Sequence, residues 1–444
     1  MIRLANALLA YSPNGAAAAL HGKLLRGGYH GALVDTSTAV LDEIRQSIPD
    51  IILIGPTLLD MDGLELARRL RANPATAKIP LFLLVAQQTD EVSQKCLDIG
   101  IDDVMTLPID ETVLFARMRP LVRVATMHTE LRMRADVAKS FGIAAARDAV
   151  NAPSLEEPEV LLAFASPEEA DFLRGALDPR VDLSVVSGDL YEVEGMLAGR
   201  NFDAAILFIR GKATPFLDLC TQIRNNPRLF NLPVVLIGDT DDPAAIATAY
   251  RHGASRVFTR PVAPIILRSA IVPLVRRQRL RWAIRQALAD TMGPATQDAL
   301  THLYHKDFLD ACLSDRVTMA TAGGRHVSII LFYFPSVAGI LDNFGETAAG
   351  HLLRQLGQWV TNLLRAEDLA ARLDGYNFCI VLPDTPLAEA QFVMNRIAGV
   401  LSHTDFAVPD VYEVVQVWMQ TSATELGPDD TPDTLIGRVR DRLG

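Results

Sequence analysis

Residues 50–54 read Asp-Ile-Ile-Leu-Ile, and residues 203–207 read Asp-Ala-Ala-Ile-Leu. A shift of 153 residues relates these two runs. The same shift relates four further pairs of landmarks: Arg71–Pro74 and Arg224–Pro227, Pro80 and Pro233, Gly100 and Gly253, and Pro108 and Pro261. A constant shift of this length is far longer than a solenoid repeat, so it indicates two copies of one globular domain.

Short apolar runs alternate with helical patterns in each copy. In the first copy, five runs are typical of strands: Ala7–Ala10, Gly31–Val34, Ile51–Ile54, Leu81–Val85 and Asp103–Thr106. Leu64–Arg71, between the third and fourth runs, has apolar residues at helical spacing. Continuous apolar strands separated by helices predict a parallel sheet covered on both faces. Five strands in this order predict an α/β class, with a doubly wound, flavodoxin-like fold for each copy.

Length and composition place the two copies within a larger globular chain. Its 444 residues suggest about three domains. The net charge of −11 disfavours nucleic acid or an anionic membrane as the main partner. No apolar run reaches about 18 residues, so we expect no membrane insertion. The N-terminus lacks the organisation of a signal peptide, and the widely spaced Cys96, Cys220, Cys312 and Cys379 predict buried thiols of a cytoplasmic protein.

Three segments of the first copy resemble the receiver domain of response regulators: Asp50–Gly63, Pro80–Val85 and Thr106–Asp110. The resemblance implies an Asp that accepts a phosphoryl group after the third strand, and acidic residues that hold a divalent cation. Gly55 and Phe208 stand at the two phosphoacceptor positions. Neither side chain can accept a phosphoryl group, so we predict no phosphorylation of either copy. Asp60 and Asp62 are nearby, but Asp62 and Gly63 predict a turn after the strand.

The other positions of receiver chemistry are replaced as well. The replacements are Tyr11, Ser12, Val85 and Leu107 in the first copy, and Ala165, Ser166, Gly238 and Arg260 in the second. A receiver without its switch still offers a surface for dimerisation or docking, by analogy of fold. We therefore expect a homodimer.

A basic segment follows the second copy. Residues 274–285 read Leu-Val-Arg-Arg-Gln-Arg-Leu-Arg-Trp-Ala-Ile-Arg and predict a helix after Pro273. One interpretation is a DNA-binding element, because five arginines gather in it. The other is a solvated connector helix whose Leu274, Leu280 and Ile284 pack inward. The net acidity of the chain favours the connector, so we expect no nucleic-acid partner.

Residues 296–444 form a third region. One apolar strand, one amphipathic helix and two short strands are predicted in it: Val327–Phe334, Gly350–Leu364, Ala370–Leu373 and Phe378–Leu382. The pair Asp374-Gly375 between the two short strands predicts a hairpin. The pattern suits an α/β sandwich.

The span Arg365–Thr385 resembles the signature of GGDEF domains, the diguanylate cyclases, and Asp298–Thr301 and Asn343–Gly345 resemble two further landmarks of that family. The order receiver, receiver, GGDEF is similar to that of PleD-like response regulators. The predicted divisions are 1–125 (first degenerate receiver), 126–156 (helical linker), 157–277 (second degenerate receiver), 278–295 (connector helix) and 296–444 (degenerate GGDEF domain).

The resemblance implies a cyclase site that this chain has lost. Diguanylate cyclases hold two metal ions with carboxylates, and paired glycines let the backbone approach GTP closely. The replacements are Asp374 for the first glycine, Tyr376 and Asn377 for the acids of the turn, Tyr333 and Pro335 at the first strand, and Leu341 and Gly350 for the guanine-reading residues. Asp342 remains, but one carboxylate cannot hold two metals. We predict no catalytic residues, no metal site, no cofactor and no enzyme activity.

The regulatory motif of the same family is retained. The resemblance implies an Arg-x-x-Asp site for cyclic di-GMP, here Arg365 and Asp368, with Arg396 as a further arginine. Guanidinium groups suit phosphate and the guanine O6/N7 edge, and a carboxylate suits the guanine N–H donors. The alternative for Arg365 and Asp368 is a surface ion pair, as we expect for Arg438 and Asp441 on a solvated helix.

These features predict a non-catalytic cyclic di-GMP receptor that acts as a scaffold. The pattern resembles alphaproteobacterial cell-cycle adaptors of the PleD-like family. That resemblance implies a place at the cell pole and regulated proteolysis, with a protease adaptor (RcdA type), a response-regulator substrate (CtrA type) and the ClpXP protease as partners. Three alternatives stay open: a dimerising scaffold that binds no nucleotide, a cyclase with rewired metals, and a DNA-binding regulator. An arginine of a receiver, such as Arg180 or Arg210, is a further candidate for the ligand site.

Overall fold

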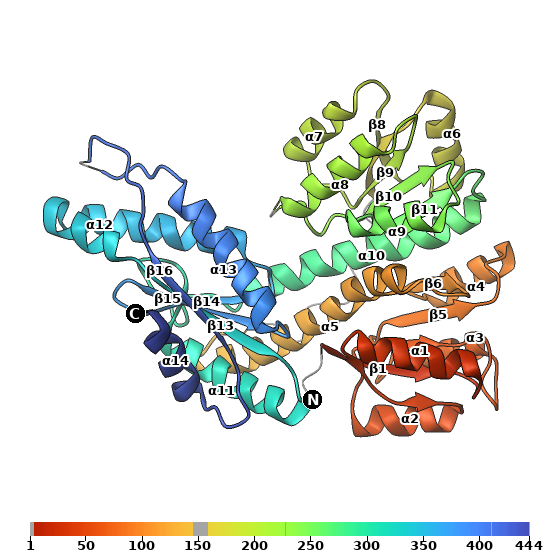
Figure 1. The fold of residues 1–444 in the computed structure, drawn as a ribbon, viewed down its shortest axis with the longest axis horizontal. Helices are drawn as coiled ribbons and strands as arrows, with labels where there is room; N and C mark the ends of the chain where they lie inside the picture. The colour runs from red at the N-terminus through yellow and green to blue at the C-terminus, as the bar shows by residue number, and fades with distance from the viewer. Residues whose placement is uncertain (1–3, 145–158, 227, 410, 444) are drawn as a thin grey trace. The chain divides into compact units, whose positions relative to one another are not determined.

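The computed structural model describes residues 4–144, 159–226, 228–409 and 411–443 (Figure 1). The chain divides into two compact units, and each is described by itself. The duplicated unit comprises Ala5–Ala125 and Val150–Ala283. The C-terminal unit comprises Met1–Leu4, Thr126–Ala149 and Ile284–Gly444. In the described part of the chain, no helix combines the length and apolar character that crossing a membrane requires.

The duplicated unit contains two parallel sheets with the same strand order. The first runs β2-β1-β4-β5-β6, and β3 also pairs with β1. Its strands are β1 (Ala5–Ala10), β2 (Tyr29–His30), β3 (Leu33–Val34), β4 (Ile51–Ile54), β5 (Leu81–Val85) and β6 (Asp103–Thr106). The second runs β8-β7-β9-β10-β11, with β7 (Val160–Phe164), β8 (Asp182–Val186), β9 (Ala204–Phe208), β10 (Val234–Gly238) and β11 (Arg256–Thr259). This order confirms the predicted doubly wound fold for both copies.

Helices separate the strands, and the side chains of each strand enter two different cores. The helices are α1 (Gly15–Arg26), α2 (Ser37–Gln46), α3 (Gly63–Ala72), α4 (Asp90–Ile99), α6 (Pro167–Ala176), α7 (Leu190–Gly199), α8 (Thr214–Asn225) and α9 (Pro243–Arg251). In β4, Leu53 belongs to the cluster that contains Leu20 of α1, whereas Ile52 belongs to the cluster that contains Leu66 of α3. Both sheet faces are therefore buried, which explains why β4 is apolar at every position.

A half-buried arginine occupies the same corner in both copies. Arg71 donates to the carbonyls of Gly100, Ala77 and Ile79, at 3.0, 2.6 and 2.7 Å, and pairs with Asp102. Its counterpart Arg224 makes the equivalent backbone bonds: to Gly253 (2.9 Å), Phe230 (2.8 Å) and Leu232 (2.7 Å). At the position of Asp102, however, the second copy has Ser255, 3.3 Å from Arg224. The corner of the second copy therefore has one negative charge fewer.

Two long helices complete the described linkers: α5 (Glu111–Ser140) and α10 (Pro264–Ala289). The described part of the predicted 126–156 linker begins as the second half of α5, and residues 145–156 lie outside the described residues. The prediction that a helix starts after Pro273 is wrong, because α10 starts at Pro264, where the first turn needs no proline N–H. Leu274 and Ile284 are buried as predicted, and Leu280 is half-buried.

The prediction that the arginines of this connector helix are solvated was also wrong for some of them. Arg277 and Arg281 are only 7% and 6% exposed, whereas Arg285 is exposed. The hydrophobic spacing alone did not predict this, because an arginine stem packs like an apolar chain while its head binds polar groups. The four cysteines, in contrast, are buried as predicted, and burial raises the pKa of the Cys96 thiol to about 12.

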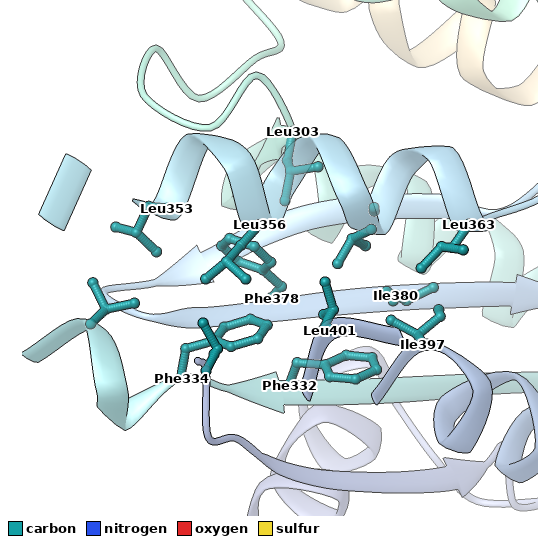
Figure 2. Packing of buried hydrophobic residues seen from close by; sticks show 14 of the residues in the cluster. Leu303, Phe332, Phe334, Leu353, Leu356, Leu363, Phe378, Ile380, Ile397 and Leu401 are labelled. Atoms are coloured by element: carbon teal, nitrogen blue, oxygen red, sulfur yellow. The ribbon is translucent and has the colours of Figure 1, made fainter. Parts of the chain in front are cut away.

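The C-terminal unit packs helices against a mixed sheet in the order β12-β14-β15-β13-β16. Its strands are β12 (Tyr304–His305), β13 (Val327–Tyr333), β14 (Leu369–Asp374), β15 (Asn377–Pro383) and β16 (Gln420–Glu425), and its helices are α11 (Lys306–Gly323), α12 (Pro335–Leu363), α13 (Leu387–Ser402) and α14 (Pro432–Arg440). Figure 2 shows Leu356 of α12 and Ile397 of α13 packed with Phe378 of β15 in one core. The strands β14 and β15 form the predicted hairpin around Gly375.

The element α12 consists of two helical segments that meet at a kink at Gly345, where φ is 83° and ψ is 180°. This conformation favours glycine, because a Cβ is strained at such positive φ. The helix predicted at Gly350–Leu364 lies in the second segment, and the first segment, which begins at Pro335, was not predicted. The first part of α12 was missed because it buries little apolar surface: Val337 is buried, but the flanking residues through Glu346 are half-buried or exposed.

Candidate functional site

In the first copy, the buried side chain of Tyr11 fills the space beside the phosphoacceptor position, Gly55. A Cβ built on Gly55 would lie 2.5 Å from Cδ2 of Tyr11, whose side chain is buried. Tyr11 therefore occupies the space above the end of β4 that a phosphoacceptor side chain would need. A larger residue at position 55 requires the tyrosine ring to move.

In the second copy, a buried apolar side chain occupies the phosphoacceptor position, and a cluster of ion pairs lies beside it. Phe208 is 2% exposed at the end of β9. Beside the vestigial site, Arg260 pairs with Asp239 at 2.6 Å and with Glu169 at 3.0 Å, and Arg210 pairs with Glu169 at 2.6 Å. Glu169 also accepts the Ser166 N–H in a capping box at the start of α6. The carboxylates near this end of the sheet are thus engaged by arginines and a helix cap.

The two loop carboxylates of the first copy have structural roles. Asp60 accepts the Ser37 N–H at 3.0 Å and its hydroxyl at 2.5 Å, and the hydroxyl bond lowers the pKa of Asp60. Asp62 caps α3 by accepting the Leu64 N–H at 2.8 Å. The predicted turn at Asp62 and Gly63 is therefore a helix N-cap.

The carboxylate in the hairpin turn of the C-terminal unit is engaged by protein groups. Asp374 pairs with Arg440 at 2.6 Å and accepts the Asn377 amide at 2.5 Å. Tyr376 packs against the core, and its carbonyl accepts the Phe334 N–H at 3.1 Å. No group of three or more His, Cys, Asp or Glu side chains suited to a metal occurs in the residues that the structure describes. The hairpin is instead held by its own ion pair and core contact.

The Arg365–Asp368 turn joins α12 to β14. The Asp368 carboxylate accepts the Arg365 N–H at 2.9 Å, and the Asp368 N–H donates to the Arg365 carbonyl at 3.2 Å. Asp368 is 7% exposed, whereas Arg365 is half-buried. The expected alternative, a surface ion pair between these side chains, is wrong, because the buried carboxylate caps the turn and leaves the Arg365 side chain outside that bond.

Arg396 reaches the same turn from α13. Its Nη2 donates to the carbonyl of Leu363 at 2.9 Å. Partial burial and then the charge of Arg365 lower the pKa of Arg396, and Asp368 opposes them. The three predicted ligand residues are therefore brought together, as two guanidinium groups beside one carboxylate.

A cavity of about 130 Å³ adjoins this turn, and two further arginines line it. Arg134 of α5 and Arg285 of α10 share its lining with Arg365 and Asp368. Arg134 is buried, donates to the Glu367 carbonyl and lies 3.3 Å from a Glu130 oxygen. Sequence reasoning placed neither residue at the site. The only available signal was the arginine-rich segment that ends at Arg285.

The structure also shows the ion pairs of three other arginines that the sequence singled out. Arg438 does not pair with Asp441: it pairs with Asp430 and donates to the Glu425 carbonyl at 2.6 Å. Arg180 and Arg210 belong to the duplicated unit, where Arg180 pairs with Asp178 at 3.1 Å and Arg210 with Glu169.

Comparison with known proteins identifies the domain types. Residues 295–443 match the diguanylate cyclase GGDEF domain, and residues 15–119 match the response regulator receiver domain. The chain is 29% identical over 422 residues to the response regulator PleD of Caulobacter vibrioides. This alignment covers 95% of this chain and 92% of PleD. The GGDEF domain of DgcB from Caulobacter crescentus, solved in complex with c-di-GMP, aligns at 18% identity with a TM-score of 0.33, covering 34% of this chain and 86% of that one.

Proposed function

We propose a function that proceeds from one premise: the chain is a response regulator related to PleD, with a receiver domain and a GGDEF domain. The proposed function is that of a cyclic di-GMP receptor without cyclase activity, which acts as a scaffold for other proteins. The observation that carries it is the convergence of Arg365, Asp368 and Arg396 beside a basic cavity.

The chemistry of this site suits cyclic di-GMP. The ligand has two anionic phosphates and two guanine bases. Arg365 and Arg396 offer guanidinium groups to phosphate oxygens or to guanine O6 and N7. Asp368 is the carboxylate of the site and suits guanine N–H donors. Three charged groups with these properties match both parts of the ligand.

The cavity sets a limit on how the ligand enters. Its volume of about 130 Å³ is below the roughly 300 Å³ at which small-molecule sites usually begin. It can therefore take one end of a dinucleotide, next to Arg134 and Arg285. The exposed Arg396 would bind the part that stays outside.

The absence of catalysis is supported by the replaced residues. Tyr333 ends β13 where the family places a metal-binding aspartate, and Tyr376 stands in the hairpin where it places an acid. Asp374, which stands where the family has a glycine, is held by Arg440. Metal-assisted attack on GTP requires carboxylates that hold the ions against the triphosphate, so we propose that GTP is not turned over.

The scaffold role follows from the combination of a ligand site with inactive receivers. Cyclic di-GMP would shift the protein between arrangements by its difference in affinity for them. We propose a homodimer that acts in regulated proteolysis at the cell pole, as an adaptor of the PopA type. Its partners would then be a protease adaptor, a response-regulator substrate and the ClpXP protease.

Calorimetric titration of the full-length protein with cyclic di-GMP tests the receptor. We expect binding that Arg365→Ala abolishes and that Arg285→Ala weakens. Arg438→Ala is the matched control, because Arg438 has the same Arg-x-x-Asp spacing but pairs with Asp430 elsewhere on the unit. Binding should survive in this control, and thermal melts verify that each variant is folded.

Two results would contradict the proposal. If the parent protein does not bind cyclic di-GMP, the receptor is excluded and a ligand-free scaffold remains. If GTP with magnesium yields pyrophosphate above background, the protein is a cyclase whose metals are held by other residues.

A further inference from the structure

A second basic cavity lies within the duplicated unit, between the first half of α5 and the second copy. Its volume is about 310 Å³, at the lower end of small-molecule sites. Seven of the sixteen described residues that line it are arginine: Arg117, Arg119, Arg123, Arg224, Arg256, Arg277 and Arg281. None of the sixteen is Asp or Glu. This concentration of positive charge needs an explanation in an acidic protein.

Two neighbouring carboxylates, Asp103 and Asp102, lie close to these arginines, and both form ion pairs. Asp103 of β6 is buried and pairs with both Arg117 and Arg256, the latter at 2.6 Å. Asp102 already pairs with Arg71 and with Arg276, at 3.1 Å from the latter. Helix α10 contains no Asp or Glu at all. Among the described residues, Asp103 thus pairs with two of the seven guanidinium groups.

The second copy has one negative charge fewer than the first at this corner. In the first copy Arg71 faces Asp102, but in the second copy Arg224 faces the Ser255 hydroxyl. The remaining bonds of Arg224 go to neutral carbonyls, and burial lowers the pKa of Arg224 to about 10. Its charge is thus solvated by dipoles and is not neutralised.

The strongest evidence for a ligand in this cavity comes from Arg277. It is 7% exposed, yet its Nε and Nη1 have no hydrogen-bond partner. A buried charged donor without an acceptor is costly, because it has left water and gained nothing in return. Arg119, which also lines the cavity, is exposed. Both side chains can donate to a molecule that enters the cavity.

We propose that this cavity is a binding site for a small molecule that bears a diphosphate group. Guanidinium forks bind phosphate oxygens in pairs, and two linked phosphates can engage arginines from both copies at once. Arg117 belongs to the first copy, and Arg256 and Arg277 belong to the second. A bound diphosphate therefore stabilises the contact between the two copies. The site is separate from the proposed cyclic di-GMP site, whose lining residues all belong to the C-terminal unit.

Titration of the full-length protein with pyrophosphate in a low-chloride buffer tests the site. We expect binding that Arg277→Met weakens about tenfold or more, and that the exposed Arg119→Ala also weakens. Without pyrophosphate, Arg277→Met should leave the unfolding temperature unchanged or raise it, because an apolar side chain removes the desolvation penalty of a buried guanidinium group whose Nε and Nη1 make no hydrogen bond. The protein is also titrated with ADP and GDP. If either binds more tightly than pyrophosphate, the ligand of the site is a nucleotide. If they bind equally tightly, the site recognises the diphosphate group alone.

Cyclic di-GMP binding separates this proposal from the previous one. Arg277→Met should retain cyclic di-GMP binding, and Arg285→Ala should retain pyrophosphate binding, since each residue lines only its own cavity. The site is excluded if the parent protein does not bind millimolar pyrophosphate. It is equally excluded if Arg277→Met and Arg119→Ala both bind it as the parent does, or if Arg277→Met unfolds at a much lower temperature, because the arginine would then be structural.

Discussion

Gly55 illustrates how a single residue can close a site. The Tyr11 ring fills the space above it, so a side chain at position 55 must displace a buried aromatic ring. We predict that Gly55→Ala destabilises the protein by about 1–3 kcal/mol, the usual range for overpacking. The measurement is urea unfolding, and the same substitution in a Tyr11→Ala background should have a much smaller effect.

Gly238→Ala is the matched control for this prediction. Gly238 ends β10, and a Cβ there would meet its nearest atom at 3.5 Å, an ordinary contact. We expect little change in stability. If Gly55→Ala were as well tolerated, Tyr11 would be mobile and the first receiver position would be open to larger side chains.

At the scale of elements, a buried ion pair joins the edge strands of the two sheets. Asp103 of β6 pairs with Arg117 of α5 and with Arg256 of β11. Burial raises the pKa of Asp103, but the two arginines outweigh it and hold the pKa below its ordinary value. We predict that Asp103→Asn lowers the free energy of unfolding by roughly 3–5 kcal/mol at neutral pH, because it leaves two buried arginines without a carboxylate.

This destabilisation should depend on pH. A depressed pKa stabilises the folded state above the ordinary pKa of about 4, and the stabilisation is lost as the pH falls through the folded value. The difference between the parent protein and Asp103→Asn should therefore shrink in acid, as followed by urea unfolding at several pH values. Asp42→Asn is the control, since Asp42 and Arg45 form an exposed pair. If the difference in the free energy of unfolding between the parent protein and Asp103→Asn did not change with pH, the effect would come from packing and not from the charge of Asp103.

Elements also show what the sequence could and could not predict. The bounds of β4, β5 and β6 match the predicted runs, because strands buried on both faces must be apolar throughout. The starts of α10 and α12 were missed, because a proline can begin a helix and because the early part of α12 is mostly exposed. Local patterns therefore located strands better than helix ends.

Some residues of the candidate site could be predicted from the sequence, and others could not. Arg365, Asp368 and Arg396 could be predicted, because two of them share a short motif and the third follows on the next helix. Arg134 and Arg285 could not, because they come from helices distant in sequence that only tertiary packing brings to the cavity. The arginine cavity of the duplicated unit was hidden for the same reason. The basic segment predicted either DNA binding or solvation, whereas Arg277 and Arg281 are buried.

At the scale of the whole molecule, the two proposed sites belong to different compact units. A ligand stabilises the unit that binds it by about 2.7 kcal/mol at one hundred times its Kd. For units of this size, that corresponds to a rise of roughly 5–11 °C in unfolding temperature. We predict two calorimetric transitions, of which cyclic di-GMP raises one and pyrophosphate raises the other. Arg365→Ala should abolish only the first shift, and Arg277→Met only the second.

The alternative is a single cooperative transition. Helix α5 contributes residues to both units, because the division between them falls at Thr126, within its span. If this continuous helix couples the units strongly, either ligand would raise one common transition, and each variant would remove only the response to its own ligand. Two separate shifts would instead show that binding in the C-terminal unit leaves the stability of the duplicated unit unchanged. Signalling between the two would then depend on how partners read each unit, and not on shared stability.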